Sequence, residues 1–486
     1  MDVKKNGDVS FWYADIGGVP GYRPPLQGDI VADVCIVGAG YTGLWTAYYL
    51  KQAAPHLNIV VIEKEFAGFG ASGRNGGWLS GGFSWSREKY EEATSRAGVI
   101  AMQAAMTGTV NEVISVAEAE GIDADIRRTD ELLVATNEAQ EQRAKAMYAQ
   151  ARSWALTDER VGYIDAAEMR RRIAVHNARG AFVIKKVARI QPAKLVQGLA
   201  RAVERLGVPI YEQTTVLSIE SGKVATNRGV VRAEKIVRAT EGFTAGIAGH
   251  ERLWLALNSA IVVTEPLSDK LWSEIGWDGY EVLGDAAHTY CYAQRTREGR
   301  IAMGGRGVPY RFGSKTDVRG VTQQATIDKL HKILTTLLPQ TKGLKLDHAW
   351  CGTLGVPRDW CTTVGFDRQT GIGWAGGYVG LGVSTSNLSG RTLRDLLLGN
   401  DTELTRLPWV NRTVRKWEPE PLRWLGVHSM YQLYRIADER EAKGLPRTSR
   451  LAALADRITG HSTASLQEFS NDRLQDLRPP GAYRPR

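Results

Sequence analysis

The chain has few of the residues that mark secreted, metal-binding or membrane-spanning proteins. Its four cysteines in 486 residues, at positions 35, 291, 351 and 361, are too few and too scattered for a disulfide scaffold, and they show no metal-ligand spacing. The N-terminus lacks the apolar core of a signal peptide, and glycines interrupt the apolar stretch 33–50. No internal repeat is present. We expect a cytoplasmic protein with no metal site and no stable membrane insertion.

The charge balance is moderately basic but spread along the chain. Lys and Arg number 62 against 53 Asp and Glu, which gives a net charge of +9. Hydrophobic residues make up 43% and charged residues 24%, an ordinary balance for a globular protein long enough to hold two domains. Because the cations form no stripe and no nucleic-acid motif is present, we expect a solvated basic surface and no nucleic-acid partner.

The most informative segment is 33–45, followed by the strand that ends at Glu63. It reads strand, glycine turn, helix, strand, acid, with Gly38, Gly40 and Gly43 in the G-x-G-x-x-G pattern. The first glycine allows a sharp turn, the second lets a pyrophosphate approach the backbone, and the third lets the helix pack on the sheet. The helix N-terminus favours phosphate, and the acid suits a ribose hydroxyl. This pattern predicts a dinucleotide site.

A second glycine-rich loop, Gly70–Gly77, places Ser72, Arg74 and Asn75 among small residues. With the fingerprint, the late segment Gly376–Val383, and the segments 188–196, 207–211 and 215–216, it resembles the D-amino-acid-oxidase-like superfamily of flavoenzymes. The resemblance runs from about residue 33 to 398. Within the superfamily, the chain looks most similar to gamma-glutamylputrescine oxidase-like amine oxidases.

The resemblance implies FAD as the cofactor and an α/β fold. It implies a Rossmann-type FAD-binding domain interleaved with an antiparallel-sheet substrate domain, plus a helical C-terminal extension. We assign 1–30 to an extended N-terminal arm, 31–85, 180–250 and 351–400 to the FAD domain, 86–179 and 251–350 to the substrate domain, and 401–486 to the extension and tail. The expected FAD contacts are Gly38, Gly40, Tyr41, Thr42, Gly43, Glu63, Lys64, Ser72, Gly73, Arg74, Asn75, Gly76, Gly77, Trp78, Leu79, Val216, Ala239, Thr240, Gly242, Cys351, Gly352, Gly377, Tyr378, Gly380, Leu381, Gly382 and Val383.

Substrate contacts are expected on the strand around Tyr290 and Tyr292. Residues two apart on a strand face the same side, and glycine-oxidase-like relatives carry a substrate-contacting tyrosine that matches Tyr292. A core aromatic pair is the alternative. His288 lies one further same-face step along, and Arg306 is a nearby cation; both are candidates.

Three positions depart from the relatives. Leu354 stands where alpha-amino-acid oxidases hold the substrate carboxylate with an arginine, which argues for a substrate with its charge elsewhere; Arg358 is a possible substitute. Ala302 stands where sarcosine-oxidase-like relatives use a lysine to promote the oxygen reaction. Cys351 falls where those relatives attach the flavin covalently. We expect non-covalent FAD, with a link through Cys351 as the alternative.

We therefore expect an FAD-dependent oxidoreductase that oxidises the C–N bond of a primary or secondary amine. The imine hydrolyses to an aldehyde plus ammonia or a smaller amine, and oxygen is reduced to hydrogen peroxide. The alternative is a dehydrogenase of an amino or hydroxy acid with another electron acceptor. An NADPH-dependent monooxygenase would need a second nucleotide fingerprint, and a non-catalytic nucleotide-binding protein would carry no chromophore. The sequence does not identify the amine or the oligomeric state.

Overall fold

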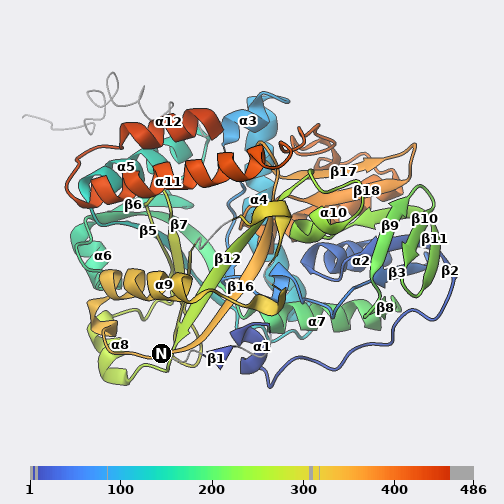
Figure 1. The fold of residues 1–486 in the computed structure, drawn as a ribbon, viewed down its shortest axis with the longest axis horizontal. Helices are drawn as coiled ribbons and strands as arrows, with labels where there is room; N and C mark the ends of the chain where they lie inside the picture. The colour runs from blue at the N-terminus through green and yellow to red at the C-terminus, as the bar shows by residue number, and fades with distance from the viewer. Residues whose placement is uncertain (1–3, 6–8, 85, 306–309, 317, 460–486) are drawn as a thin grey trace, which may run out of the picture.

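The computed structural model describes residues 4–5, 9–84, 86–305, 310–316 and 318–459. Within these residues, two sheets of eight and ten strands are built from alternating stretches of the chain. The smaller sheet lies to the right and the larger to the left and centre of Figure 1. This mixed α/β architecture confirms the expected fold class. The residue boundaries of the domains stay a prediction.

The smaller sheet has a parallel centre, in the order β18-β11-β2-β3-β8, and β17 adds an antiparallel edge. Its central strand β2 has four consecutive buried residues before the glycine turn, as expected for a strand covered on both faces. The strands are β2 (Ile30–Val37), β3 (Ile59–Ile62), β8 (Ile210–Tyr211), β9 (Val216–Glu220), β10 (Lys223–Thr226), β11 (Gly229–Arg238), β17 (Thr363–Asp367) and β18 (Ile372–Gly376).

The larger sheet is mostly antiparallel, in the order β1-β16-β12-β15-β14-β13-β5-β7-β4, with β6 beside β7. β14 and β15 pair as an antiparallel hairpin. β4 and β7 belong to this sheet, although their residues fall in the ranges assigned to the FAD domain. The strands are β1 (Lys4–Lys5), β4 (Trp78–Leu79), β5 (Arg127–Ala135), β6 (Val161–Asp165), β7 (Gly180–Arg189), β12 (Leu255–Thr264), β13 (Val282–Asp285), β14 (Cys291–Arg295), β15 (Ile301–Gly305) and β16 (Leu346–Val356).

The helices begin and end at residues suited to those positions. Ser95 caps α4, Asn137 caps α5, and α10 ends at the left-handed Gly399. α10 packs on α2 so closely that a Cβ at Gly390 would lie 2.8 Å from the Trp45 backbone. The helices are α1 (Phe11–Asp15), α2 (Tyr41–Ala53), α3 (Arg87–Glu91), α4 (Arg96–Ala119), α5 (Glu138–Ser153), α6 (Ala166–Arg172), α7 (Pro192–Arg205), α8 (Asp269–Ile275), α9 (Gln324–Leu337), α10 (Gly382–Leu398), α11 (Leu422–Ala442) and α12 (Arg450–Thr459).

One helix among the described residues, α4, is long and apolar enough to cross a membrane by length and composition alone. In the structure, 44% of that window is buried, and Val99, Met102 and Met106 belong to the hydrophobic core that also contains residues of β2, α2 and α10. Core helices pass the same test, so this is weak evidence for a membrane span. The apolar stretch 33–50 is divided between β2 and α2.

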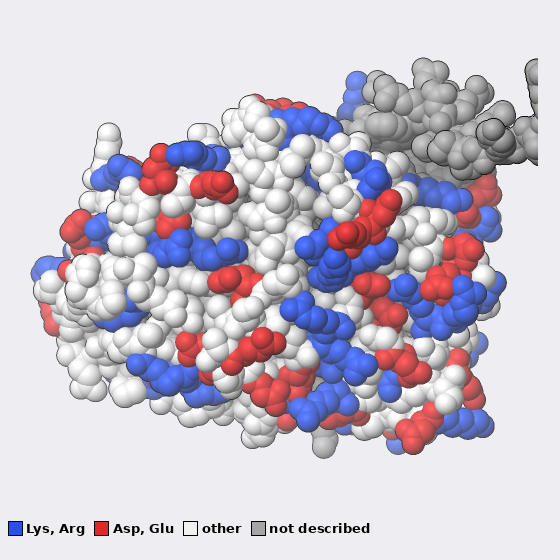
Figure 2. Space-filling model, turned by 180° about the vertical axis from the view of Figure 1, so that it is seen from behind, with Lys and Arg blue, Asp and Glu red and all other residues white. Residues whose placement is uncertain are grey.

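The sequence predicted an extended N-terminal arm over residues 1–30. The structure corrects this prediction, because part of the arm forms helix α1. Phe11, Trp12 and Tyr13 form part of α1 and are buried, because three consecutive aromatic side chains gain more from burial than from remaining exposed. Trp12 Nε1 donates to the Asn75 carbonyl at 2.8 Å, so the arm supports the second glycine-rich loop. On the face shown in Figure 2, Lys and Arg side chains alternate with Asp and Glu.

Candidate active site

The glycine turn between β2 and α2 is packed too closely for larger residues. Gly38 has φ +107°, and its Cβ would lie 2.6 Å from the Ala239 carbonyl oxygen. A Cβ at Gly43 would lie 1.9 Å from the Gly38 oxygen, and one at Gly40 would lie 2.9 Å from Ser72 Oγ. These separations are shorter than van der Waals contact, so the turn requires glycine. The backbone is left open for a ligand at the helix N-terminus.

Glu63 lies directly beneath this turn. Its carboxylate accepts the Ala39 N–H at 2.8 Å and the Glu65 N–H at 2.9 Å. Burial raises the pKa of Glu63 to about 7 despite these two donors. Ser72 Oγ accepts the first N–H of α2, from Tyr41, at 2.8 Å, so the second glycine-rich loop is fastened to the first.

Arg74 is the cation of the second loop and is 2% exposed. Its Nη1 donates to the Cys351 carbonyl at 3.1 Å, and its guanidinium lies 4.3 Å from the Phe69 ring centre. Its Nε and Nη2 have no partner in the described structure, and neither has Trp78 Nε1. Burial lowers the pKa of Arg74 to about 10. Buried donors without acceptors are rare in native proteins, and they fit a site that takes a polar ligand.

Some of the remaining expected FAD contacts lie near the start of α10, and others lie elsewhere. Thr42 Oγ1 is 2.8 Å from Tyr378 Oη, which joins α2 to the segment before α10. The buried Glu241 carboxylate accepts the N–H groups of Gly377 at 2.9 Å and Tyr378 at 3.0 Å, and burial raises its pKa to about 7. Thr240 and Gly242 flank it. Val216 begins β9, Leu79 pairs in β4, and Lys64 is exposed.

A cavity of about 720 Å³ opens beside this region. Ser84 and Arg87 line it from the start of α3, and Ser259 and Leu354 line it from the larger sheet. Several expected FAD contacts also line it, namely Arg74, Asn75, Gly76, Trp78, Gly352, Gly380, Leu381 and Val383. Its size is in the range of cofactor and substrate sites.

Tyr290 and Tyr292 both line the cavity, while Cys291 packs in the core of the larger sheet. Tyr292 Oη is 2.9 Å from Ser259 Oγ, and its ring meets Trp78 edge-on with centroids 6.2 Å apart. A Cβ at Gly76 would lie 2.8 Å from the Tyr292 ring. Tyr292, on β14 of the larger sheet, therefore packs against the glycines of the second glycine-rich loop.

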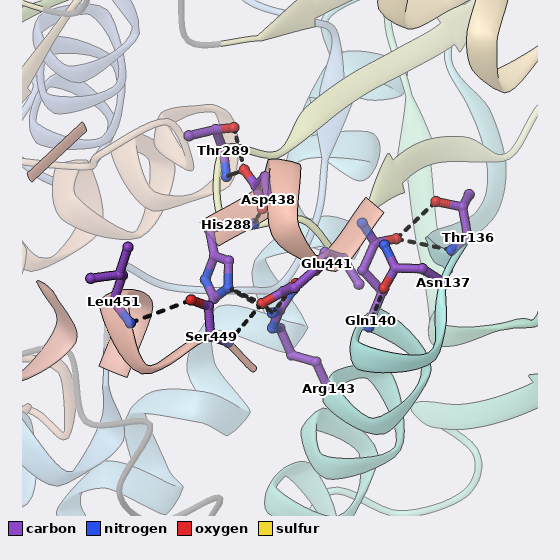
Figure 3. Close-up of polar contacts among 11 residues, drawn as sticks. Thr136, Asn137, Gln140, Arg143, His288, Thr289, Asp438, Glu441, Ser449 and Leu451 are labelled. Atoms are coloured by element: carbon purple, nitrogen blue, oxygen red, sulfur yellow. Dashed lines mark hydrogen bonds and ion pairs between the residues drawn. The ribbon is translucent and has the colours of Figure 1, made fainter. Parts of the chain in front are cut away.

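His288 lines the cavity but is engaged by the C-terminal extension, as Figure 3 shows. Its Nε2 is 2.9 Å from Glu441 Oε1 and 2.7 Å from Arg143 Nη2. Its backbone N–H donates to Asp438, and its ring stacks on Tyr434. These contacts hold the loop before β14 against α11. Arg306, the fourth substrate candidate, lies outside the described residues.

The structure places the three residues that depart from the flavoenzyme pattern, Leu354, Cys351 and Ala302, on strands of the larger sheet. Leu354 lines the cavity, and Arg358 pairs with Glu418 at 3.0 Å. The Cys351 side chain is buried and, unlike Gly352 and Leu354, is not among the residues that line the cavity. Alternation along β16 explains this difference. Ala302 is buried in β15.

Helices α11 and α12, which follow residue 400, cover one side of the cavity, and we call these two helices the roof. In Figure 1, α11 and α12 cross above the larger sheet. Cavity residues that the sequence did not reveal are Ser80, Glu131, Leu133, Arg143, Met147, Asp285, Met430, Tyr431, Tyr434, Asp456 and Thr459. No local pattern marked them, because these residues come from β5, α5, β13 and the roof and meet only in the folded chain.

Within the part of the chain that the structure describes, two groups of side chains have a spacing that a metal ion could use, and both contact cationic side chains. His288, Asp438 and Glu441 form one group, and Arg143 lies within it at 2.9 Å from Glu441. Asp15, Asp125 and Glu298 form the other; there Asp125 pairs with Lys194 at 2.8 Å and Arg297 at 2.7 Å. Both are ion-pair clusters.

The residues present fit FAD. The glycine turn would hold the pyrophosphate, Glu63 the ribose, and the unpaired donors of Arg74 the polar flavin edge. The α10 N-terminus suits the same edge when it carries negative charge. These groups would hold the two halves of a flavin dinucleotide next to the cavity.

Comparisons with known proteins agree with this geometry. Gamma-glutamylputrescine oxidoreductase of Escherichia coli K12 is 30% identical over 382 residues, covering 77% of this chain and 85% of that protein. Glycine oxidase of Bacillus licheniformis is 24% identical over 381 residues, covering 76% and 93%. The crystal structure of glycine oxidase from Geobacillus kaustophilus has a TM-score of 0.64 at 20% identity, covering 76% of this chain and 96% of that one.

The family match itself spans residues 33–396 and carries the description FAD dependent oxidoreductase. It covers both sheets apart from β1 and the first residues of β2, and it ends before α11 and α12. The chain belongs to the DAO family of FAD-dependent oxidoreductases, and FAD is the cofactor that this membership implies.

Proposed function

We propose that the protein oxidises the C–N bond of a primary or secondary amine and that oxygen accepts the electrons. For a primary amine, the balanced reaction is R–CH2–NH2 + O2 + H2O → R–CHO + NH3 + H2O2. The observation that carries this proposal is Leu354 in the cavity wall, where an arginine would be needed to hold an alpha-carboxylate. The E. coli relative is named for an amine substrate, which supports the same class.

FAD supplies the two-electron chemistry when it is bound. The protein residues bind and orient the amine and exclude water. We infer that the rings of Trp78, Tyr290 and Tyr292 form the wall against which the reacting carbon lies, and that the roof helices keep solvent out. Orientation of this kind contributes much of an enzyme's rate, since it replaces an encounter in solution.

FAD is proposed to be held without a covalent bond. Cys351 is buried on the side of β16 away from the cavity. Burial also favours the unreactive, protonated thiol.

The first experiment is the absorption spectrum of the purified protein, followed by anaerobic mixing with a panel of amines and amino acids. Bleaching of the flavin band by an amine, and not by alpha-amino acids of similar size, supports the proposal. Bleaching by alpha-amino acids alone contradicts it. A colourless protein that takes up no added FAD would overturn the assignment of the whole site.

A dehydrogenase that uses another acceptor is the second candidate, and Ala302 is the observation that favours it. A small buried side chain provides no cation to promote the oxygen reaction. After anaerobic reduction by substrate, air is admitted and the return of the flavin band is timed. Return within milliseconds to seconds with stoichiometric peroxide supports the oxidase; slow return, with fast turnover on a quinone dye, supports the dehydrogenase.

A further inference from the structure

A buried carboxylate in the cavity wall has no cationic partner among the described residues. Glu131, on β5, is 7% exposed and lines the cavity. Its Oε2 accepts the Ser80 hydroxyl at 2.6 Å, and Ser80 is its partner among the described residues. A buried carboxylate with a single neutral hydrogen bond is expensive in free energy, so its presence in a binding cavity calls for an explanation.

Several other charged groups of the cavity have partners within the described structure, whereas Arg74 keeps the two unpaired donors considered above for the flavin. Arg143, Arg358 and Arg423 pair with Glu441, Glu418 and Glu420. The Asp285 carboxylate accepts the Cys291 N–H at 2.9 Å, which fixes the loop before β14. Arg87 Nη2 donates to Gln103 at 2.6 Å. Glu131, which has one neutral hydrogen-bond donor and no cation beside it in the described structure, has a charge that a ligand can pair with.

The position of Glu131 fits the far end of an elongated substrate. Glu131 and Leu133 are two apart on β5 and both line the cavity. Leu133 and Trp78 both approach Gly284, whose Cβ would lie 2.8 Å and 3.3 Å from them, and Trp78 meets Tyr292. The wall therefore runs from an acid, over apolar side chains, to the tyrosine beside the FAD loop.

We propose that Glu131, oriented by Ser80, binds a second ammonium group of the substrate, so that the preferred substrates are diamines or polyamines with a methylene spacer. This inference rests on the proposed amine oxidation. An ammonium placed at Glu131 replaces the missing cation, while the methylene groups lie against Leu133 and Trp78. Burial raises the pKa of Glu131 to about 7, and a bound ammonium would lower it again.

The test compares 1,4-diaminobutane with 1-aminobutane, which differ in the second ammonium, on the FAD-loaded full chain. Wild type should show a kcat/KM ratio in favour of the diamine of about a hundredfold, as for a desolvated charge pair. Glu131→Gln keeps the shape and the acceptor for Ser80, and it should reduce this ratio at least about tenfold. The kcat/KM values of diamines with three to six carbons then indicate which spacer length matches the distance from Glu131 to the reacting amine.

Glu281→Gln is the matched control. Glu281 is buried just before β13, the strand next to β5, and is not among the residues that line the cavity, so its variant should leave the ratio unchanged. A wild-type ratio near one, or an equal ratio in wild type and Glu131→Gln, overturns the inference. Loss of bound FAD in Glu131→Gln also overturns it, since the acid would then serve the cofactor.

Calorimetric titration separates this inference from the proposed function. If 1-aminobutane is oxidised but the diamine has no advantage that depends on Glu131, the amine oxidase stands and the inference fails. If no amine is oxidised, but 1,4-diaminobutane binds more tightly to wild type than to Glu131→Gln, the proposed reaction fails and the cation site stands.

Discussion

The roof over the cavity depends on Glu441, and Glu441→Gln should loosen it. The Glu441 side chain is 1% exposed and the Arg143 side chain 9% exposed, with 2.9 Å between them. Glu441 also contacts His288 Nε2 at 2.9 Å and accepts the Ser449 N–H at 3.1 Å. It thus joins α5, the loop before β14, α11 and the start of α12 (Figure 3).

The size of the effect follows from leaving Arg143 buried without its carboxylate. Breaking a buried pair costs about 3 kcal/mol at the lower end of the usual range, which corresponds to about a hundredfold more frequent opening of the roof. Hydrogen exchange read by mass spectrometry on peptides from 436–459 measures that opening directly. Peptides from α2 provide an internal reference.

Glu439→Gln is the control for this experiment. Glu439 lies on the same helix, but its side chain is 60% exposed and 3.9 Å from Arg435, so its loss should cost less than about 0.5 kcal/mol. Equal exchange in Glu441→Gln and wild type would refute the reasoning.

The stabilisation of the roof by Glu441 should also depend on pH in a definite direction. Although burial opposes it, the hydrogen bond from His288 and the charge of Arg143 hold the pKa of Glu441 below its usual value. Its contribution is present above about pH 4.5 and is lost as the pH falls further.

Three further predictions follow from single side chains. Gly43→Ala should lower FAD occupancy at least about tenfold, read from visible absorbance, because its Cβ would fall 1.9 Å from the Gly38 oxygen; full occupancy would contradict the packing. Acid precipitation should leave the flavin in the supernatant of both wild type and Cys351→Ser, whereas a yellow wild-type pellet that becomes colourless in the variant would show a covalent link. Because the folded pKa of Glu131 is raised to about 7, the wild-type protein binds an extra proton when folded and loses stability as the pH rises from about 4.5 to 7, by at most roughly 3 kcal/mol relative to Glu131→Gln. Denaturant unfolding at pH 5 and pH 8 should show this difference growing, and a constant difference would disprove it.

The parts of the fold that depend on local sequence could be predicted. The turn at Gly38–Gly43 needs glycine because its own backbone crowds it, and that requirement is visible in the spacing of three residues. The hairpin of β14 and β15 follows from two apolar runs joined by a short polar turn. In both cases the partners are close in the chain.

The functional roles that depend on distant partners could not be predicted. His288 lies on the expected strand approach, but its partners are 145 and 153 residues away, so nothing local indicated that it would hold the roof. Glu131 follows Arg127–Asp130 and reads as part of a charged surface segment. Glu131 faces the cavity only because β5 pairs with β7 and β13 in the folded sheet.

The roof also has a consequence for how the protein is made. α11 and α12 follow every strand of both sheets in the sequence, so a ribosome releases them after the residues that form the FAD site. A nascent chain can therefore present an open site to the cofactor before Glu441 exists to close it. Loading during synthesis then needs no unfolding of the finished protein, whereas exchange of FAD in the mature enzyme depends on how often the roof opens.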